Sequence, residues 1–267
     1  MSGNSGTKSD QPLKSVDSVP ALRRAVTILD LVAAASGSLS AADITRQLAL
    51  PKSTAHGQIN VLTELGLLVR TAEGTYRLGP HLMHWADSFL SQMDFVSLFR
   101  DYFAADSELD GYTITLTVLD RDEVVYVSCR NTDQPLGHSF RIGKRLPAPF
   151  TATGKVLLSE LEYDELERIF ADRFPAPLTA SSVSNLAELQ AEFPGIRERG
   201  FSIDNGQIHE AMTCVGSAIY DHTGKVVAGI ATSFLSSEAR SDMTTRLGEK
   251  IRHAAMALSQ QSGYRGK

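Results

Sequence analysis

Residues 40–66 have the sequence SAADITRQLALPKSTAHGQINVLTELG, which contains two short helix patterns with a tight turn between them. Ser40 and Asp43 have the spacing of a helix N-cap and an acidic first-turn residue, so a helix is expected to begin here. Pro51 suits the first turn of the second helix, and Gly66 suits its end. Two short helices joined in this way predict a helix-turn-helix, whose second helix projects from the fold.

The flanking sequence extends this motif in both directions. Apolar residues at helical spacing predict a helix from Pro20 to about Ala35 before it. After it, residues 67–70 and 75–78 predict two short strands joined by a glycine-containing turn. Three helices followed by a hairpin predict a winged helix-turn-helix domain over residues 18–80.

The last helix of this domain has one apolar and one polar face. The residues expected on its buried face are Ala55, Ile59, Leu62 and Leu65. The residues expected on the opposite face are Ser53, Gly57, Asn60 and Glu64.

The remainder of the chain predicts a connector and a second domain. Residues 81–109 have a helical pattern that is broken near Asp94, which favours a connector helix. Residues 110–267 predict a mixed α/β domain with an antiparallel sheet. Further strands are expected at 124–129, 201–204, 213–220 and 226–233, with helices after Thr151, at 163–170, at 184–199 and near the C-terminus. The predicted fold class is therefore α+β.

The first strand of the second domain has a strictly alternating pattern. Ile114, Leu116 and Val118 alternate with threonines. Alternation with a period of two is typical of a strand that has one buried face and one exposed face. We therefore expect a half-buried strand with its threonines in solvent.

The composition excludes several protein classes. The 267 residues are 42% hydrophobic and 21% charged, which is ordinary globular composition. No apolar run reaches the roughly 18 residues needed to span a bilayer, and residues 1–17 predict a disordered polar tail rather than a signal peptide. Cys129 and Cys214 lie far apart, so neither a disulfide framework nor a cysteine-based zinc site is expected. These features favour a cytoplasmic protein.

The charge is distributed unevenly along the chain. Residues 18–80 contain six basic and four acidic side chains, which gives this segment a net charge of +2. The whole chain has a net charge of −5 and the tail before residue 18 is neutral, so the residues after position 80 carry a net charge of −7. This asymmetry is compatible with an N-terminal domain that faces nucleic acid.

Five short blocks resemble the IclR family of regulators, and together they span the chain from Ser18 to Tyr264. In order, the blocks are RAVTIL (24–29), LPKST (50–54), YRLG (76–79), TATGK (151–155) and CVGSAIYD (214–221). The resemblance implies a winged helix-turn-helix, a connector helix and a GAF-like α/β effector-binding domain. It also implies homodimers that often pair into homotetramers on palindromic operators.

The function implied by this resemblance is that of a ligand-responsive transcription regulator. Such a protein, for example a repressor that controls a catabolic operon, binds double-stranded operator DNA and a small-molecule effector. The residues themselves predict no enzymatic activity, cofactor or metal, since no catalytic arrangement, metal-ligand cluster or nucleotide-binding motif is recognised.

The expected DNA contacts lie on the third helix, the wing and the first helix. Donors at a helix N-terminus hold phosphates, and polar side chains further along the helix reach base edges. Arginines on the wing and on the first helix are expected to contact the phosphate backbone or minor groove. The expected DNA-binding residues are Arg24, Lys52, Ser53, Thr54, His56, Gly57, Gln58, Asn60, Arg70 and Arg77. Without the resemblance, the same residues would equally suit a solvated polar face.

Gly57 departs from the family pattern, which usually has arginine at this position. Glycine cannot contact a base or a phosphate through a side chain, and it costs about 1 kcal/mol of helix propensity relative to alanine. We infer either an altered operator sequence or a closer approach of the helix backbone to the groove.

The resemblance also places an effector pocket between the sheet and the helix that begins at Thr151. Backbone amides at the start of this helix suit a carboxylate, and the mixture of apolar and polar residues suits a small carboxylate or amide-like compound with an apolar body. The expected effector-binding residues are His138, Leu146, Ala152, Thr153, Gly154, Asp204, Met212, Cys214 and Ser233. Simpler structural roles are a packed thiol at Cys214, a loop position at His138 and an N-cap at Thr151.

Three residues near this pocket depart from the family pattern. Gln207 stands where glutamate is usual, Ala211 where glycine is usual and Ala218 where proline is usual. The change at Gln207 removes a negative charge from the margin of the pocket, which favours a ligand of different charge or shape.

Two other functions are compatible with parts of the sequence. The chain is alternatively a small-molecule-binding module with a head that does not bind DNA, or a thiol hydrolase centred on Cys214 with His209 or His222 as base. No cluster of glycines frames Cys214 as an oxyanion hole would require, which disfavours the enzyme. His81 and His84 have metal-ligand spacing but no carboxylate or cysteine partner nearby, so no metal site is expected.

Overall fold

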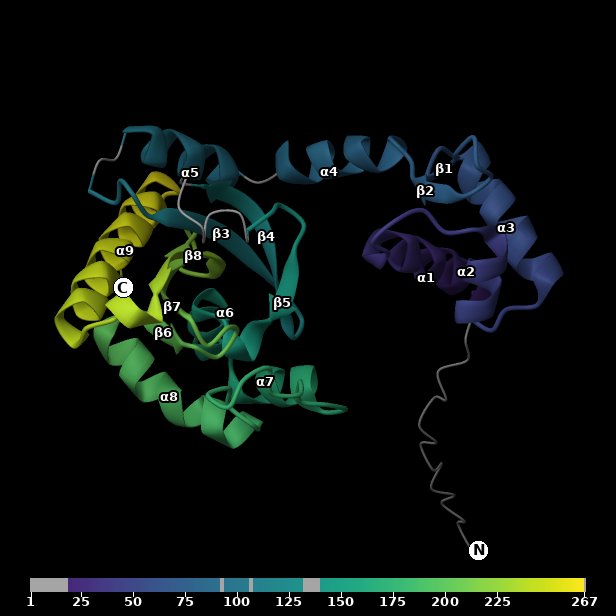
Figure 1. Cartoon of the computed structure of the whole chain (residues 1–267). Helices are drawn as coiled ribbons and strands as arrows, with labels where there is room; N and C mark the ends of the chain where they lie inside the picture. Colours follow the sequence, from purple (N-terminus) through teal and green to yellow (C-terminus); the bar gives the residue numbers. More distant parts are fainter. Residues whose placement is uncertain (1–18, 92–93, 106–107, 132–139, 267) are drawn as a thin grey trace, which may run out of the picture. The chain divides into compact units, whose positions relative to one another are not determined.

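The computed structural model describes residues 19–91, 94–105, 108–131 and 140–266. The tail at residues 1–17, which the sequence predicts to be disordered, lies outside these ranges. The chain divides into two compact units, Met1–Phe89 and Leu90–Lys267. Helix α4 (His81–Ser91) crosses the boundary between them (Figure 1).

The first unit is a three-helix domain with a two-stranded wing. Its elements are α1 (Pro20–Ala34), α2 (Ala41–Gln47), α3 (Lys52–Glu64), β1 (Leu68–Arg70) and β2 (Tyr76–Leu78). The expected cap of α2 is present: the amide of Asp43 donates to Ser40 Oγ at 3.1 Å, and the amide of Ser40 donates to the Asp43 carboxylate at 3.2 Å. The core residues are Ile28, Val32, Ile44, Ile59, Leu62, Leu67, Leu68 and Tyr76.

Leu65 does not lie on the buried face of α3, contrary to the sequence prediction. Helix α3 ends at Glu64, and the chain turns at Gly66, which has a φ of +69°. This left-handed turn moves Leu67 into the core, where it is 6% exposed, and leaves Leu65 57% exposed. The apolar period of the sequence therefore runs one residue past the end of the helix.

The second unit is a six-stranded antiparallel sheet with the strand order β5-β4-β3-β8-β7-β6. The strands are β3 (Thr113–Asp120), β4 (Glu123–Arg130), β5 (Arg145–Pro147), β6 (Ser202–Asn205), β7 (Met212–Tyr220) and β8 (Val226–Leu235). The α-helices are α5 (Asp94–Ala105), α6 (Ala152–Ser159), α7 (Tyr163–Phe170), α8 (Leu186–Arg199) and α9 (Ser241–Gln261). Strand β5 had no counterpart in the sequence prediction.

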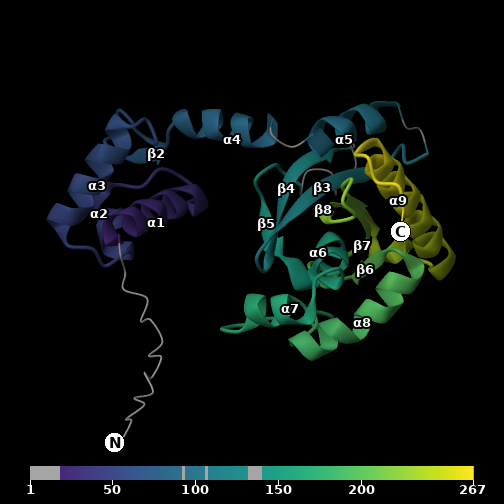
Figure 2. The same ribbon diagram turned by 180° about the vertical axis from the view of Figure 1, so that it is seen from behind.

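Helices cover both faces of this sheet. Helices α5 and α9 pack on one face, where Phe99 and Ile251 contact the strands, and α6 packs on the other face (Figures 1 and 2). Each face therefore has its own hydrophobic core.

Strand β3 is buried on both faces, so the predicted half-buried strand is wrong. Thr113, Thr115 and Thr117 are at most 3% exposed, because helix α6 covers the face on which they lie. The alternating residues of β3 face two different buried layers: Ile114 and Leu116 face the core under α5 and α9, and the threonines face α6 rather than solvent. The hydroxyl of Thr115 donates to the carbonyl of Ala231 at 3.4 Å, whereas the hydroxyl of Thr117 is buried without a hydrogen-bond partner among the described residues.

Two glycines allow the start of α6 to approach its neighbours closely. A Cβ atom on Gly154 would lie 2.1 Å from the carbonyl oxygen of Ala148, and one on Gly216 of β7 would lie 3.0 Å from the backbone of α6. Thr151 caps the helix through a 2.9 Å bond from the amide of Gly154. The N-terminus of α6 is therefore fixed by backbone contacts that leave no room for a Cβ atom at Gly154 and only a tight fit for one at Gly216.

Gly154→Ala is expected to destabilise the second unit by about 1–3 kcal/mol, because overpacking against backbone outweighs the gain in helix propensity of about 1 kcal/mol. The measurement is the unfolding transition of the second unit in urea. Gly57→Ala is the matched control: a Cβ atom on Gly57 meets nothing within 4 Å, so this variant should gain up to about 1 kcal/mol in the first unit. An equal gain in both variants would contradict the packing argument.

Candidate functional site

Helix α3 presents a continuous polar surface opposite its core. Ala55, Ile59 and Leu62 are buried, whereas the opposite side is exposed at Lys52, Ser53, His56, Gly57 and Asn60, with Thr54 half-buried at the edge. These side chains offer an ammonium group, a hydroxyl, an imidazole and an amide along one face of a projecting helix. This arrangement suits contact with phosphates at the helix start and with base edges further along.

Gln58 differs from the other predicted residues of α3. Its side-chain amide donates to the carbonyl of Ala21 at 3.0 Å and so ties α3 to the start of α1. Among the residues that the structure describes, Gln58 Oε1 and Arg24 Nε are buried without a hydrogen-bond partner. Both side chains are half-buried between the helices rather than extended into solvent.

The wing presents an arginine on each of its faces. Arg70 pairs with Tyr76 and Val69 pairs with Arg77, so Arg70 and Arg77 lie on opposite sides of the hairpin. Both arginines are exposed. The guanidinium of Arg70 lies against the turn, since a Cβ atom on Gly74 would be 3.5 Å from its Nη2 atom.

The structure gives no packing reason for glycine at position 57. Its backbone is helical, and a Cβ atom there would meet no atom within 4 Å. The loss of helix propensity is therefore not offset by any contact within the described residues of the fold.

The second unit contains a small cavity between the sheet and the start of α6. It has a volume of about 20 Å³. Its walls are Thr115, Tyr126, Phe140, Leu146, Thr151, Ala152, Thr153, Asp204, Ile208, Met212, Cys214, Ala231 and Ser233.

Most of the residues predicted to bind the effector meet at this cavity. Those that line it are Leu146, Ala152, Thr153, Asp204, Met212, Cys214 and Ser233. Gly154 does not line the cavity but packs against Ala148, and His138 lies outside the described residues.

Several wall residues were not predicted from the sequence. Thr115 could have been found if β3 had been recognised as buried on both faces, since it then faces α6. Tyr126 of β4 and Ala231 of β8 lie on the two strands that flank β3, and strand pairing, which one sequence does not give, brings them to the same cavity. Phe140 and Ile208 lie in loops and had no recognisable signal.

The volume of the cavity limits what it holds in this conformation. A space of about 20 Å³ accommodates one water molecule, which needs roughly 10–15 Å³ by the same measure. An organic acid or amide with several heavy atoms requires the walls to move apart.

Asp204 is the charged group within the cavity wall. It is 1% exposed, and burial raises the pKa of its carboxyl to about 6, although the amide of Gln207 donates to it at 2.7 Å and Lys155 attracts it. The thiol of Cys214 lies 3.2 Å from Ser233 Oγ, and burial raises its pKa well above the usual value. A protonated, buried thiol is a poor nucleophile, so the chemistry of Cys214 does not suit the thiol hydrolase considered from the sequence.

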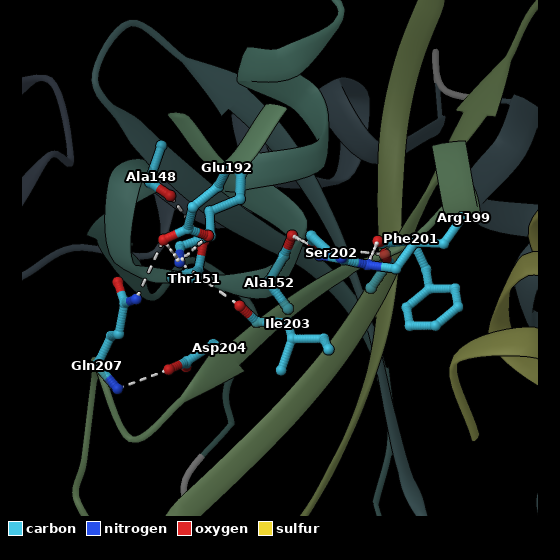
Figure 3. Close-up of polar contacts among 12 residues, drawn as sticks. Ala148, Thr151, Ala152, Glu192, Arg199, Phe201, Ser202, Ile203, Asp204 and Gln207 are labelled. Carbon is cyan, nitrogen blue, oxygen red and sulfur yellow. Dashed lines mark hydrogen bonds and ion pairs between the residues drawn. The ribbon is translucent and has the colours of Figure 1, made fainter. Parts of the chain in front are cut away.

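A second polar cluster is connected to Asp204 of the cavity wall through Gln207 (Figure 3). The fully buried ammonium group of Lys155 on α6 forms an ion pair with Glu192 on α8 at 2.6 Å. Gln207 lies between this pair and Asp204, with its side chain toward Glu192 and its backbone amide toward Asp204.

Within the part of the chain that the structure describes, no group of three or more His, Cys, Asp or Glu side chains is arranged to hold a metal ion. Within the same ranges, no helix combines the length and apolar character needed to cross a membrane.

Comparison with protein families and curated proteins gives concordant matches over both units. Residues 21–72 match the IclR helix-turn-helix domain, and residues 87–260 match the C-terminal domain of bacterial transcriptional regulators of the IclR type. The chain is 28% identical to the HTH-type transcriptional regulator XynR of Escherichia coli over 247 residues, 92% of this chain and 98% of that protein. It is 26% identical to the HTH-type transcriptional repressor AllR of the same organism over 246 residues, 92% of this chain and 91% of that protein.

Solved structures show the same relationship. The repressor BlcR of Agobacterium tumefaciens is 55% identical in sequence, with 94% of this chain and 100% of that chain covered and a TM-score of 0.62. The IclR protein of Thermotoga maritima is 26% identical, with 91% and 98% covered and a TM-score of 0.70. These relatives are transcriptional regulators rather than enzymes.

Asp204→Asn is expected to remove a pH-dependent loss of stability. Because the pKa is raised to about 6, the folded chain binds more protons than the unfolded chain between the two pKa values. The stability of wild type relative to the Asp204→Asn variant therefore falls as the pH rises from about 4 to about 6 and is constant above that range. The difference should be on the order of 3 kcal/mol, measured by urea unfolding of both proteins across this window. Two parallel stability curves would show that Asp204 titrates normally.

Proposed function

Because the chain belongs to the IclR family of bacterial transcriptional regulators, we propose that it is a ligand-responsive repressor that binds a palindromic operator. The observation that carries this proposal is the exposed polar face of α3 on a winged helix-turn-helix domain. The names of BlcR and AllR as repressors support the direction of regulation. We propose that the protein acts in the cytoplasm and that it controls a catabolic operon.

Operator recognition is assigned to α3 and the wing. Lys52 and Ser53 at the start of the helix hold phosphates and fix its register, whereas His56 and Asn60 contact base edges in the major groove. Gly57 lies between them without a side chain, which lets the helix backbone approach the groove closely. Arg77 on the outer face of the wing contacts the adjacent phosphates.

The proposed assembly is a homodimer, two of which pair into a tetramer. Helix α4 supports it, because Met83, Trp85 and Phe89 are 70%, 51% and 48% exposed on this helix. Exposed apolar side chains of this size suit burial against a second copy. Two copies related by a twofold axis would place two recognition helices on half-sites of a palindrome about one helical turn or a multiple apart.

The effector is proposed to be a small carboxylate or amide-like compound that occupies an enlarged form of the cavity. The amides of Ala152 and Thr153 at the start of α6 provide donors for a carboxylate or carbonyl oxygen. Leu146 and Met212 supply apolar wall, while Ser233 and Cys214 supply polar contacts. Ligand binding changes the affinity for DNA through the connector at residues 81–109. The size of this change is limited by the difference between the ligand's affinities for the two arrangements of the regulator.

The first test is retention of the purified protein on its own promoter region. A footprint over a palindrome that weakens by about 10³-fold or more between roughly 50 and 200 mM salt is expected, since several phosphates are neutralised. Lys52→Ala should weaken binding to all sequences and reduce the salt slope, whereas Asn60→Ala should cost about 1–3 kcal/mol at one operator position. No footprint in low salt would eliminate the operator assignment and favour a head that does not bind DNA.

Gly57→Arg tests the close approach of α3 to the groove. An arginine has room in the free protein, since nothing lies within 4 Å of the new Cβ atom. We expect altered operator preference, with affinity for the natural operator reduced by about tenfold or more, equivalent to roughly 1.4 kcal/mol. The footprinting assay measures both, and an unchanged preference and affinity would contradict the proposed approach.

A further inference from the structure

A fully buried lysine lies on the helix that lines the cavity. Lys155 is on α6 and has no exposed surface. Its Nζ atom donates to both carboxylate oxygens of Glu192 on α8, at 2.6 and 2.8 Å, and lies 3.5 Å from the carbonyl oxygen of Ile203. The cation is therefore paired with Glu192, and Lys155 is not part of the cavity wall.

Gln207 connects this ion pair to the cavity wall. Its Nε2 atom lies 3.5 Å from Glu192 Oε1, and its backbone amide donates to Asp204 at 2.7 Å. The residue is 8% exposed, and its Oε1 atom is buried without a hydrogen-bond partner among the described residues. One neutral side chain therefore separates two carboxylates that share a single cation.

The two carboxylates differ in how well their charges are compensated. Glu192 is 29% exposed and forms an ion pair with Lys155 directly. Asp204 is 1% exposed, and its charge is compensated by the backbone amides of Gln207 and Ile208, a hydrogen bond from the Cys214 side chain and the more distant attraction of Lys155. The other titratable groups that act on Asp204 or on Lys155 are Cys214 of β7, Tyr126 of β4 and Arg199 of α8.

We propose that Gln207 determines the charge of the cavity: its neutral amide is what allows Asp204 to ionise beside the Lys155–Glu192 pair. A glutamate at this position would add a third carboxylate at about the 3.5 Å separation that Gln207 Nε2 now has from Glu192. With one cation among three carboxylates, the cluster would have to bind a proton at neutral pH.

The consequence for ligands rests on the function proposed above. With Gln207, the cavity wall carries a carboxylate at neutral pH, so an anionic ligand placed against Asp204 must bring a proton with it. An uncharged hydrogen-bond donor needs no proton and can bond to the Asp204 carboxylate directly. Gln207 is thus a specificity-determining residue that acts through Asp204 rather than by lining the cavity.

The test uses the full chain and needs no ligand. Unfolding temperatures of wild type and Gln207→Glu are compared from about pH 5 to about pH 8. At the acidic end the new carboxyl is protonated and similar in shape to the amide, so the two proteins should unfold within about 1 °C of each other. At the alkaline end the variant should unfold about 5 °C or more below wild type, because three neighbouring carboxylates then repel one another with a single cation among them.

Three companion variants separate charge from shape. Gln207→Met removes the amide contacts without adding charge, so any loss should be the same at every pH. Gln207→Glu combined with Glu192→Gln exchanges the carboxyl and the amide, which should restore the pH profile of wild type. Gln207→Glu combined with Asp204→Asn removes the crowded charge and should also flatten the loss.

The outcomes decide between the proposal and its alternatives. A loss in Gln207→Glu that is equal at all pH values, or that persists in the exchanged variant, would overturn the proposal and leave Gln207 a packing residue. Operator retention of the same variant is recorded separately. If wild type is not retained on operator DNA, the proposed function is contradicted, whereas the inference about the charge of the cavity is unaffected.

Discussion

The close packing of the N-terminus of α6 on the sheet is the constraint on which the second unit depends. Gly154 brings the helix against the backbone of Ala148, and Gly216 brings β7 against Ala152 and Thr153. The hydroxyl of Ser202 then donates to the carbonyl of Ala152 and ties β6 to the same helix turn. This layer is held by backbone contacts, so its geometry varies little with side-chain rotamers.

Three properties of the cavity follow from this packing. The threonines of β3 are buried because α6 lies over them, and Lys155 is buried because it is on the same helix, one turn from the cap. Asp204 faces the start of the helix and loses its solvent, which raises its pKa. A buried lysine and a buried aspartate in one layer require partners, and Glu192 and Gln207 supply them.

The sequence was informative where local physics determines structure. The capping box at Ser40, the turn glycine at position 66 and the wing hairpin were predictable because each depends on residues within one or two turns of chain. Helix α7 has the predicted bounds, since its apolar period and flanking residues are also local. The family resemblance added the cavity positions, which are spread over strands far apart in the chain.

Long-range packing defeated the same reasoning in specific ways. The alternation in β3 is real, but it cannot show whether the second face meets water or a helix, and the sheet here is covered on both sides. Leu65 follows the helical period, yet the left-handed turn after it ends the helix and exposes it. Gln58 looked like its neighbours on α3, but only the position of α1 shows that Ala21 takes its amide.

The small size of the cavity bears directly on regulation. A ligand that fits only after the walls separate binds a conformation other than the one described here, so its apparent affinity is reduced by the population of that conformation. The same requirement couples ligand binding to conformation, since the cavity as described has a volume of only about 20 Å³. At such a site ligand binding is coupled to conformation directly. The free energy needed to open the layer under α6 is the free-energy difference between the closed conformation and the open one that binds the ligand.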